Sequence, residues 1–352
     1  MRQSHALGIM VHFRALDNGP TRNTTPRRTA YLACRFDKPA ANATWSALLA
    51  SKEFLTSEES DGVSRVYFVR TNGSWEFCTE PPTAHDVLTV SLEEPTDGRD
   101  VFKAGAGSRI ETEFLTLFRL YLPLLLGGYH ARRTGNVFIT AHVAQSLDGR
   151  IACTNGHSQW ISNEANLIHS HRLRALHDVV LVGGRTVKTD DPQLTVRHVT
   201  GENPVRVILS ASGSVLKLQE SRNVFDEGGA TVICTTEARA NIQINGHPGN
   251  VDLIDIEATD GPFIEPDAIA KVLSERGLHS VFLEGGSQTL SNFLQHGRID
   301  ILHVHVAPMI LGSGIASFSL PEVSRVQDGQ KLQMEHFEME GELLFECRAF
   351  RS

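Results

Sequence analysis

The stretch SVFLEGGS, residues 280–287, shows the pattern on which the C-terminal part of the chain is built. It predicts a short buried strand, Ser280–Glu284, because the middle of the run is apolar and uncharged. Two glycines follow, and glycine turns a chain sharply at little steric cost. Residues Ser287–Gln295 then fit a helix that begins directly after the turn. The stretch is therefore typical of a strand–turn–helix unit of an α/β sheet.

The same alternation recurs along the chain before this unit. Short, mostly β-branched or apolar runs predict five further strands, at Val137–Ala144, Asp178–Gly183, Val205–Leu209, Thr231–Thr235 and Val251–Ile256. Two helices are expected between strands: Asn163–Leu176, capped by Ser162, and Asp267–Arg276, opened by Pro266 and stopped by Gly277.

The late strands Ile299–Ala307 and Glu342–Phe350 leave no room for further crossover helices, so an antiparallel finish is expected. The fold class predicted is an open α/β sheet, mainly parallel, with an antiparallel C-terminal edge. Ligands bind such sheets beyond the carboxyl ends of the strands. Gly183-Gly184, Gly285-Gly286 and Gly312-Ser313-Gly314 mark that edge.

Residues 1–133 differ from the rest in their weak periodicity and polar clusters. Their clearest elements are a strand at Ser64–Arg70 and an apolar helix in Phe114–Gly128, expected to stop near Leu126 because of Pro123. The stretch Gly127–Gly135 is interpreted as a connector. Because 352 residues suffice for two domains, we predict a smaller N-terminal module of unknown fold, residues 1–133, and a second domain, residues 134–352.

Composition excludes several functional classes. The formal net charge of −8 argues against a general nucleic-acid or anionic-membrane binder, and Phe114–Gly128 is too short to span a bilayer. The five cysteines are scattered without a paired spacing, which supports neither a zinc site nor a redox dithiol. Free cysteines and the absence of a signal-peptide pattern at Ala6–Phe13 fit a reducing cytoplasm.

Two glycine turns follow predicted strands. Glu284-Gly285-Gly286-Ser287 and Gly183-Gly184-Arg185-Thr186-Val187 let the backbone approach a phosphate, and the first N–H groups of a helix favour negative charge. The alternative for each is a plain tight turn. The dinucleotide fingerprint G-x-G-x-x-G is absent. Two such turns on one sheet edge favour an extended phosphorylated cofactor.

Two further constellations carry charge. Asp190-Asp191-Pro192 leads to Arg197, which offers an acid and an oxyanion clamp in one loop, although adjacent carboxylates before proline also fit a turn or helix cap. Ser158-Gln159-Trp160-Ile161-Ser162 precedes a helix that carries His169, His171, Arg172 and Arg174. The alternatives here are a core tryptophan and arginines on a solvated face. His169 and His171 are two residues apart, so they do not form a metal pair.

In this order, the segments resemble the reductase domain of bacterial riboflavin biosynthesis, the NADPH-dependent 5-amino-6-(5-phosphoribosylamino)uracil reductase. The resemblance implies a dihydrofolate-reductase-like fold and covers nothing before about Val137. The matching segments are Ala144–Ala152, Ser158–Ser162, His171–Ala175, Val182–Val187, Asp190–Arg197, Asn203–Val207, Glu284–Gly286 and Ala307–Gly312.

For the substrate, the resemblance implies a small phosphorylated pyrimidine. Ser158, Arg174 and Arg197 match the family residues that hold the ribose phosphate, and two guanidinium groups with a hydroxyl suit a phosphomonoester. Leu194 is implied as a further substrate contact. Glu284 would face the polar ribose or pyrimidine groups, and it is one of two candidate catalytic residues.

For the cofactor, the resemblance implies NADPH. The residues at its positions are Ala144, Trp160, Gly183, Thr186, Asp190, Ala211, Ser212, Gly285, Gly286, Ser287, Gln288 and Thr289. Ala144 would lie beside the nicotinamide, and Ala211 or Ser212 would support the preference for NADPH. Asp190, the second candidate catalytic residue, is interpreted as handling a proton, as orienting the nicotinamide amide, or as a structural residue.

The implied reaction opens the ribosyl ring to an imine or aldehyde-level species, and hydride delivered to C1′ gives the ribitylamino product. Two departures stand against a full match. His142 replaces a lysine that many bacterial members have two residues before the Ala144 position. The zinc-deaminase signature, His-x-Glu followed by Pro-Cys-x-x-Cys, is missing. The one His-x-Glu, His336–Glu338, has no partner thiols. Residues 1–133 are therefore not expected to be a zinc deaminase.

Two alternatives stay open beside this reaction. One is a reductase of the same fold that uses NADPH on another small carbonyl or imine. The other is a catalytically silent binding scaffold, against which the joint presence of the glycine turns and both arginines argues. Family members pair as dimers, so a homodimer is expected.

Overall fold

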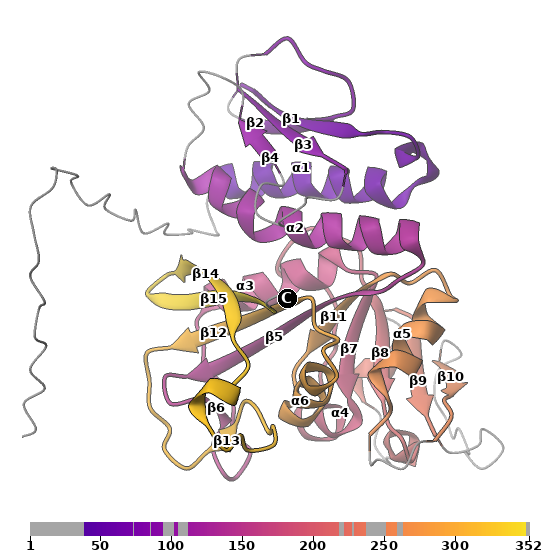
Figure 1. Cartoon of the computed structure of the whole chain (residues 1–352), viewed down its shortest axis with the longest axis vertical. Coiled ribbons are helices and arrows are strands. Elements are labelled where there is room, and N and C mark those ends of the chain that lie inside the picture. Colours follow the sequence, from indigo (N-terminus) through magenta and orange to yellow (C-terminus); the bar gives the residue numbers. More distant parts are fainter. Residues whose placement is uncertain are drawn as a thin grey trace, which may run out of the picture. The chain divides into compact units, whose positions relative to one another are not determined.

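The structure of the chain, a computed structural model, describes residues 39–72, 74–84, 86–93, 102–104, 112–217, 222–226, 229–236, 251–258 and 263–349 (Figure 1). All of these residues fall within one compact unit, which spans Leu32–Ser352. Three expectations concern segments that lie outside the described residues: the unpaired state of Cys34, the N-terminal stretch Ala6–Phe13, and the end of the last strand at Phe350.

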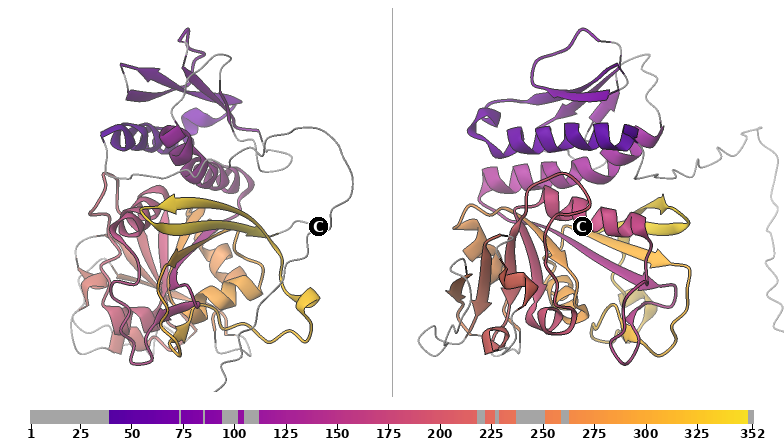
Figure 2. Two further views of the ribbon diagram at one scale, coloured as in Figure 1. Left: turned by 90° about the vertical axis from the view of Figure 1, so that its left-hand side faces the viewer. Right: turned by 180° about the vertical axis from the view of Figure 1, so that it is seen from behind.

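The N-terminal elements form a four-stranded antiparallel sheet in the order β2-β1-β3-β4. The elements are α1 (Pro39–Thr56), β1 (Arg65–Thr71), β2 (Ser74–Cys78), β3 (Val87–Ser91), β4 (Phe102–Ala104) and α2 (Thr112–Thr134). Both helices lie on the same side of this sheet (Figures 1 and 2). Buried Phe68 of β1 joins sheet and helix, since its ring centroid lies 4.7 Å from that of Phe118 in α2.

Helix α2 corrects two expectations. It does not stop near Leu126, and Gly127–Gly135 is no connector, because the helix passes through Pro123 and both glycines to Thr134. The physical reason is close packing: a Cβ at Gly127 would lie 2.4 Å from the Phe138 ring, and one at Gly128 would lie 3.1 Å from the Ser280 Cβ. The glycines therefore mark a close approach of helix to sheet, and burial of the apolar face offsets the lost hydrogen bond at proline.

The C-terminal elements form a nine-stranded sheet in the order β10-β9-β8-β7-β11-β5-β12-β15-β14. The strands are β5 (Phe138–Ser146), β7 (Val179–Gly183), β8 (Val205–Leu209), β9 (Thr231–Thr235), β10 (Val251–Asp255), β11 (Ser280–Glu284), β12 (Ile301–Ala307), β14 (Leu332–Met339) and β15 (Glu342–Ala349). Pairing is parallel from β10 to β12 and antiparallel from β12 through β15 to β14. The predicted fold class, a mainly parallel α/β sheet with an antiparallel C-terminal edge, is confirmed.

Helices cover both faces of this sheet (Figure 1). They are α3 (Glu164–Leu176), α4 (Gly184–Asp190), α5 (Pro266–Ser274) and α6 (Ser287–Gln295), and a small pair of strands, β6 (Arg150–Ala152) and β13 (Ile315–Ala316), lies outside it. The N-cap of α3 is Asn163, whose side chain accepts a hydrogen bond from the N–H of Asn166. The expected cap, Ser162, instead accepts a bond from the Asn166 side-chain amide.

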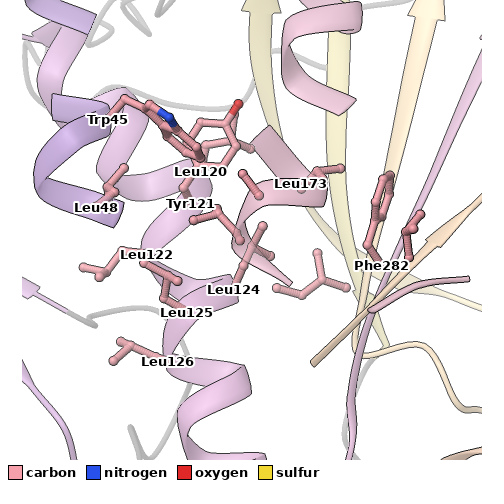
Figure 3. Close-up of a cluster of buried hydrophobic side chains, with 14 of the residues drawn as sticks. Trp45, Leu48, Leu120, Tyr121, Leu122, Leu124, Leu125, Leu126, Leu173 and Phe282 are labelled. Carbon is pink, nitrogen blue, oxygen red and sulfur yellow. The ribbon is translucent and has the colours of Figure 1, made fainter. Parts of the chain in front are cut away.

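The two faces of the sheet belong to two hydrophobic clusters. Val179 and Leu181 pack with residues of α5 and α6, whereas Val180 and Val182 point to the opposite face, as the period of two in a strand requires. The cluster that contains Val180 and Val182 continues into the N-terminal elements. Figure 3 shows part of this cluster. Trp45 and Leu48 come from α1, Leu173 from α3 and Phe282 from β11, and α2 contributes Leu120, Tyr121, Leu122, Leu124, Leu125 and Leu126. The N-terminal helices thus complete one face of the C-terminal sheet, and the functional division after residue 133 stays a prediction.

Three findings concern what the described ranges lack. None of the described helices combines the length and the hydropathy of a membrane-spanning segment. No group of three or more His, Cys, Asp or Glu side chains in these ranges is arranged to hold a metal ion. Four cysteines, at positions 78, 153, 234 and 347, are free thiols.

Candidate active site

The carboxyl ends of β7 and β11 meet at one edge of the sheet. The two strands are parallel neighbours, with Leu283 opposite Leu181, so the glycine turns that follow Gly183 and Glu284 lie next to each other. On the other side of β11, Glu284 pairs in register with His142 of β5. The parallel sheet therefore brings together residues that lie far apart in the chain, such as Leu181 and Leu283 or His142 and Glu284.

The two glycine turns interlock through threonine side chains. A Cβ at Gly183 would lie 2.6 Å from Thr289 Oγ1, and a Cβ at Gly286 would lie 3.0 Å from Thr186 Oγ1. Gly285 and Gly286 also have φ angles of +80° and +79°, which side-chain-bearing residues rarely adopt. The four predicted cofactor residues Gly183, Thr186, Gly286 and Thr289 are thus one local structure, which we name the glycine cradle.

Helix α6 leaves the glycine cradle with its first N–H groups directed toward the sheet edge. Its first helical hydrogen bond runs from Leu290 N–H to the Gly286 carbonyl at 3.0 Å. The N–H groups before Leu290 have no helical acceptor, as in every helix, and they give this end a partial positive charge. A turn without side chains followed by free N–H groups suits the phosphate of a dinucleotide.

Arg174 and Glu284 form an ion pair at this edge. Arg174 Nε lies 2.7 Å and Nη2 2.5 Å from the two Glu284 oxygens, and Nη1 donates to the Thr195 carbonyl at 2.9 Å. The Arg174 side chain is 9% exposed and that of Glu284 22% exposed. The alternative of a solvated helix arginine is therefore wrong for Arg174.

Arg197 lies in the neighbourhood of this pair. Its Nη1 donates to Thr195 Oγ1 at 2.6 Å, beside the carbonyl that Arg174 binds. Partial burial and the charge of Arg174 lower the pKa of Arg197, whereas the charge of Glu284 raises it. Two guanidinium groups that repel each other next to one carboxylate leave net positive charge, which an anion such as a phosphomonoester would neutralise.

The backbone of Arg197 is fixed by His171. The Arg197 N–H donates to His171 Nδ1 at 3.0 Å, so the imidazole carries its proton on Nε2. Burial first, then the charge of Arg174, lowers the pKa of His171 to about 3. The ring is therefore neutral at neutral pH, which its role as an acceptor requires. Sequence reasoning missed His171, although its place in the His-Arg-x-Arg segment is the signal that points to it.

The two aspartates at the end of α4 differ in environment. The Asp191 carboxylate accepts two hydrogen bonds from Asn223, one from its N–H at 2.9 Å and one from its side-chain amide at 3.0 Å, and the Asp191 backbone carbonyl accepts a third from the same amide at 3.0 Å. Asp190 is exposed at the surface, yet partial desolvation raises the pKa of its carboxyl group. Asp191 thus takes the structural role, and Asp190 is the member of the pair that is available for chemistry.

Several predicted site residues are not joined to this group by contacts. Ser158 and Trp160 are exposed, Trp160 by 86% and with φ +68°, and no hydrogen bond among the described residues links either to the arginines. The alternative of a core tryptophan is wrong. Leu194 is 1% exposed and belongs to the hydrophobic core, so a contact of this residue with substrate stays a prediction.

The remaining predicted cofactor residues lie near the carboxyl ends of β5 and β8 and in the first turn of α6. Ala144 lies on β5 opposite His305 of β12. Ala211 and Ser212 follow β8 after one intervening residue, Ser210, and the Ala211 carbonyl accepts a bond from Thr235 Oγ1 at 2.8 Å. In the first turn of α6, Ser287 Oγ lies 3.1 Å from Ser319 Oγ, and Gln288 is exposed.

A buried polar chain beside the site was not predicted. Tyr121 Oη lies 2.9 Å from His169 Nδ1, His169 Nε2 lies 3.1 Å from His303 Nδ1, and His303 Nε2 lies 3.3 Å from Glu346 Oε2. Burial holds the pKa of His169 well below its usual range. The signal was present in β12, where His303 and His305 alternate with apolar residues and so share one face.

His142 lies beside this chain. It is buried, its ring centroid lies 5.3 Å from that of His169, and its Nε2 has no hydrogen-bond partner in the described ranges. Burial holds the pKa of His142 well below its usual range, with the charges of His305 and His303 acting in the same direction. The position next to Glu284 therefore holds a neutral imidazole, where the resemblance leads us to expect the lysine of many bacterial members.

Comparison with known sequences gives one family and a set of relatives. Residues 137–342 match the family described as RibD C-terminal domain. The riboflavin biosynthesis protein RibD of Bacillus amyloliquefaciens is 34% identical over 188 residues, 53% of this chain and 50% of that protein. RibD of Mycobacterium tuberculosis is 32% identical over 216 residues, 60% of this chain and 54% of that protein. The chain spans about half the length of these curated relatives.

Comparison with solved structures extends over most of the chain. A diaminohydroxyphosphoribosylaminopyrimidine deaminase/5-amino-6-(5-phosphoribosylamino)uracil reductase from Thermotoga maritima superposes with a TM-score of 0.57 at 22% identity, covering 87% of this chain and 99% of that chain. RibD of Acinetobacter baumannii gives a TM-score of 0.57 at 17% identity, covering 88% and 99%. At these identities the likeness concerns the fold.

Proposed function

Because the chain belongs to the RibD C-terminal domain family, we propose that it is an NADPH-dependent oxidoreductase of riboflavin biosynthesis. The proposed reaction reduces the ribosyl group of 5-amino-6-(5-phosphoribosylamino)uracil, or of its pyrimidinone relative, to the ribitylamino product. The observation that carries the proposal is the convergence of Arg174, Glu284 and Arg197 next to the glycine cradle. A phosphate-binding group and a dinucleotide-binding turn at one sheet edge are what this reaction needs.

The glycine cradle fits a pyridine dinucleotide. A side chain at Gly183 or Gly286 would fill the space between the two turns, and both positions hold glycine. We assign the cofactor to this cradle and to the first turn of α6, with Ala144, Asp190, Ala211 and Ser212 at neighbouring strand and helix ends. When bound, the reduced nicotinamide supplies the hydride.

The protein's own groups bind and orient the substrate. Arg174 and Arg197, with Ser158, hold the phosphate, because guanidinium groups bind phosphate oxygens through charge-assisted hydrogen bonds. Glu284 is held by Arg174, so its carboxylate is fixed for a bond to ribose or pyrimidine. Asp190, whose pKa is raised, holds a proton at its carboxyl group more readily than an ordinary aspartate.

The neutral His142 supports a second candidate. A substrate that needs a cation two residues before Ala144 would not find one here, since burial lowers the pKa of His142. This favours an NADPH reductase of the same fold that acts on another small carbonyl or imine. The two candidates differ in whether turnover requires the phosphorylated pyrimidine.

The deciding experiment follows oxidation of NADPH by absorbance, with the phosphorylated pyrimidine as substrate. Arg197→Ala should raise the KM for this substrate by about ten- to hundredfold, because it removes hydrogen bonds to a charged group, with little change in the KM for NADPH. The control is Arg119→Ala, since Arg119 is exposed on α2 away from the sheet edge. NADH in place of NADPH tests the cofactor preference.

The other outcomes separate the alternatives. Tight NADPH binding without turnover of the pyrimidine would favour the reductase of another carbonyl or imine. No binding of either dinucleotide would favour a silent scaffold. Turnover with an unchanged KM in Arg197→Ala would contradict the assignment of the phosphate to this arginine.

A further inference from the structure

The loop that carries Arg197 is held at several points. Leu194, at its start, is buried, and the Val196 N–H donates to Asn203 Oδ1 at 2.7 Å, which closes the loop across its base. The Arg197 N–H donates to His171 of α3 at 3.0 Å. We name residues 194–203 the arginine loop. These contacts fix its first half to the C-terminal elements.

The second half of the arginine loop is held by the N-terminal module. Trp45 of α1 donates from its indole Nε1 to the Thr200 carbonyl at 2.9 Å. The next residue, Gly201, is in close contact with α3, since a Cβ there would lie 2.6 Å from the Ala175 Cβ and 3.8 Å from Leu49 Cδ2 of α1. The end of the loop therefore lies between α1 and α3.

Trp45 is itself held in one orientation. It is 4% exposed, and its ring meets that of Tyr121 edge-on, with centroids 5.7 Å apart. The guanidinium of Arg172 lies 5.3 Å from the Trp45 ring centroid. Lys52, two turns further along α1, donates to the Ala175 carbonyl at 2.8 Å. The indole N–H thus points at Thr200 from a rigid platform formed by α1, α2 and α3.

We propose that Trp45 is a positioning residue for the substrate-phosphate site, and that helix α1 of the N-terminal module fixes the arginine loop for binding. This inference rests on the proposed role of Arg197. His171 and Trp45 hold the loop at positions 197 and 200, so the Arg197 backbone is ordered before substrate arrives. A preordered group binds more tightly because less conformational entropy is lost on binding. The N-terminal module then acts through substrate affinity and leaves the chemical step unchanged.

The test compares two tryptophans. Trp45→Phe keeps a buried aromatic ring over Arg172 and removes the N–H that Thr200 accepts. Trp75→Phe is the matched control, because Trp75 is also buried in the N-terminal module, and its indole N–H has no acceptor among the described residues. Each variant is assayed for kcat and KM with the phosphorylated pyrimidine, for KM with NADPH, and for hydrogen exchange at the Val196 and Arg197 amides.

The expected result is a change in the KM for the pyrimidine without a change in the other kinetic constants. Trp45→Phe should raise the KM for the phosphorylated pyrimidine about three- to tenfold, the effect of one net hydrogen bond, with kcat and the KM for NADPH unchanged. Amide exchange at Val196 and Arg197 should be faster than in the wild type. Trp75→Phe should match the wild type in every measurement.

Two results would overturn the proposal. One is that Trp45→Phe has the same amide hydrogen exchange at Val196 and Arg197 as the wild type and an unaltered KM for the pyrimidine. The other is a fall in kcat without a specific change in the KM for the pyrimidine, which indicates a structural role alone. Failure of the proposed function is a separate outcome: there Arg197→Ala leaves KM unaltered, while exchange in Trp45→Phe still reports whether α1 holds the loop.

Discussion

Position 286 places two requirements on one residue. The φ angle of Gly286 is +79°, and a Cβ would come within 3.0 Å of Thr186 Oγ1 and 3.6 Å of Thr289 Oγ1. Backbone conformation and space both therefore require glycine. The same residue lies directly before helix α6, where the cofactor phosphate is proposed to bind.

Gly286→Ala is expected to affect both stability and binding. The left-handed conformation should cost about 1–2 kcal/mol of unfolding free energy. Crowding against Thr186 should also displace the turn and raise the Kd for NADPH by roughly tenfold or more, as measured by titration of nicotinamide fluorescence. The control is Gly297→Ala, at φ +63° with nothing within 4 Å, which shares the conformational cost without the crowding. Equal NADPH affinity in both variants would contradict the cradle assignment.

The ion pair between Arg174 and Glu284 shows why one residue can serve two purposes. Each is a predicted substrate contact, and each is also the other's partner at 2.5–2.7 Å. A carboxylate held in this way keeps one orientation, which is what a binding group needs before substrate arrives. The pairing was not predictable from the sequence, because 110 residues separate the two positions.

At the scale of elements, the two adjacent aspartates at the end of α4 have different environments. Asp191, with φ +44°, accepts the bonds of Asn223 and joins the helix to the segment after β8. Asp190 has a raised pKa and accepts no hydrogen bond from the described residues. The capping role of Asp191 and the chemical role proposed for Asp190 therefore fall on neighbouring residues.

The matched pair Asp191→Asn and Asp190→Asn tests this division, since each removes one charge and keeps the shape. Asp191→Asn should lower the unfolding free energy by about 1–2 kcal/mol, because an amide has one acceptor oxygen for the two bonds that Asn223 donates to the carboxylate. Asp190→Asn should change it by less than about 0.5 kcal/mol, as for other surface sites. It should lower kcat and remove one titration from the pH profile of kcat. A wild-type profile in Asp190→Asn would show that Asp190 is not catalytic.

At the scale of the whole molecule, buried histidines join the N-terminal helices to the central sheet. The histidines with lowered pKa values include His142, His169, His171, His177 and His305. Burial is the largest cause in each, and it lowers the pKa of His171 to about 3 and of His177 to about 4. The folded chain thus keeps these rings neutral where the unfolded chain protonates them.

This sets the sign of the pH dependence. In the unfolded state these histidines bind protons near pH 6.5, and in the folded state they do not. The stability that they contribute is therefore fully present above about pH 6.5 and is lost as the pH falls toward 4. Each such histidine should contribute up to about 1.4 kcal/mol per pH unit in this window. Urea unfolding at pH 7, 6 and 5 measures the slope. His177→Gln removes one of these histidines and should lower the slope by up to the value for one proton, about 1.4 kcal/mol per pH unit. Equal stability of the wild type at pH 7 and pH 5 would contradict the interpretation.

The protein family, and with it the fold of the C-terminal part, is established at this scale. The site assignments, NADPH, the phosphorylated pyrimidine, the homodimer and the cytoplasmic location stay predictions. The polar cluster of histidines was not predicted, because a single histidine in a strand gives no sign of the neighbours that it will meet.

The sequence by itself determined the local elements of the sheet. Val205–Leu209, Thr231–Thr235, Ser280–Glu284 and the helix Ser287–Gln295 begin and end where their apolar runs and glycines predict. The reason is that short buried strands and glycine turns depend on backbone preferences within a few residues. For the same reason, the order of glycine turns and arginines was enough to place the candidate site at one edge of the sheet.

Only the tertiary structure decided how the N-terminal module meets that site. Pro123 and Gly127 suggested the end of α2, yet close packing of Gly127 against Phe138 keeps the helix intact. The bond from Trp45 to Thr200 joins residues 155 positions apart. Such contacts depend on which faces of distant elements pack together, and no local pattern in the chain encodes that pairing.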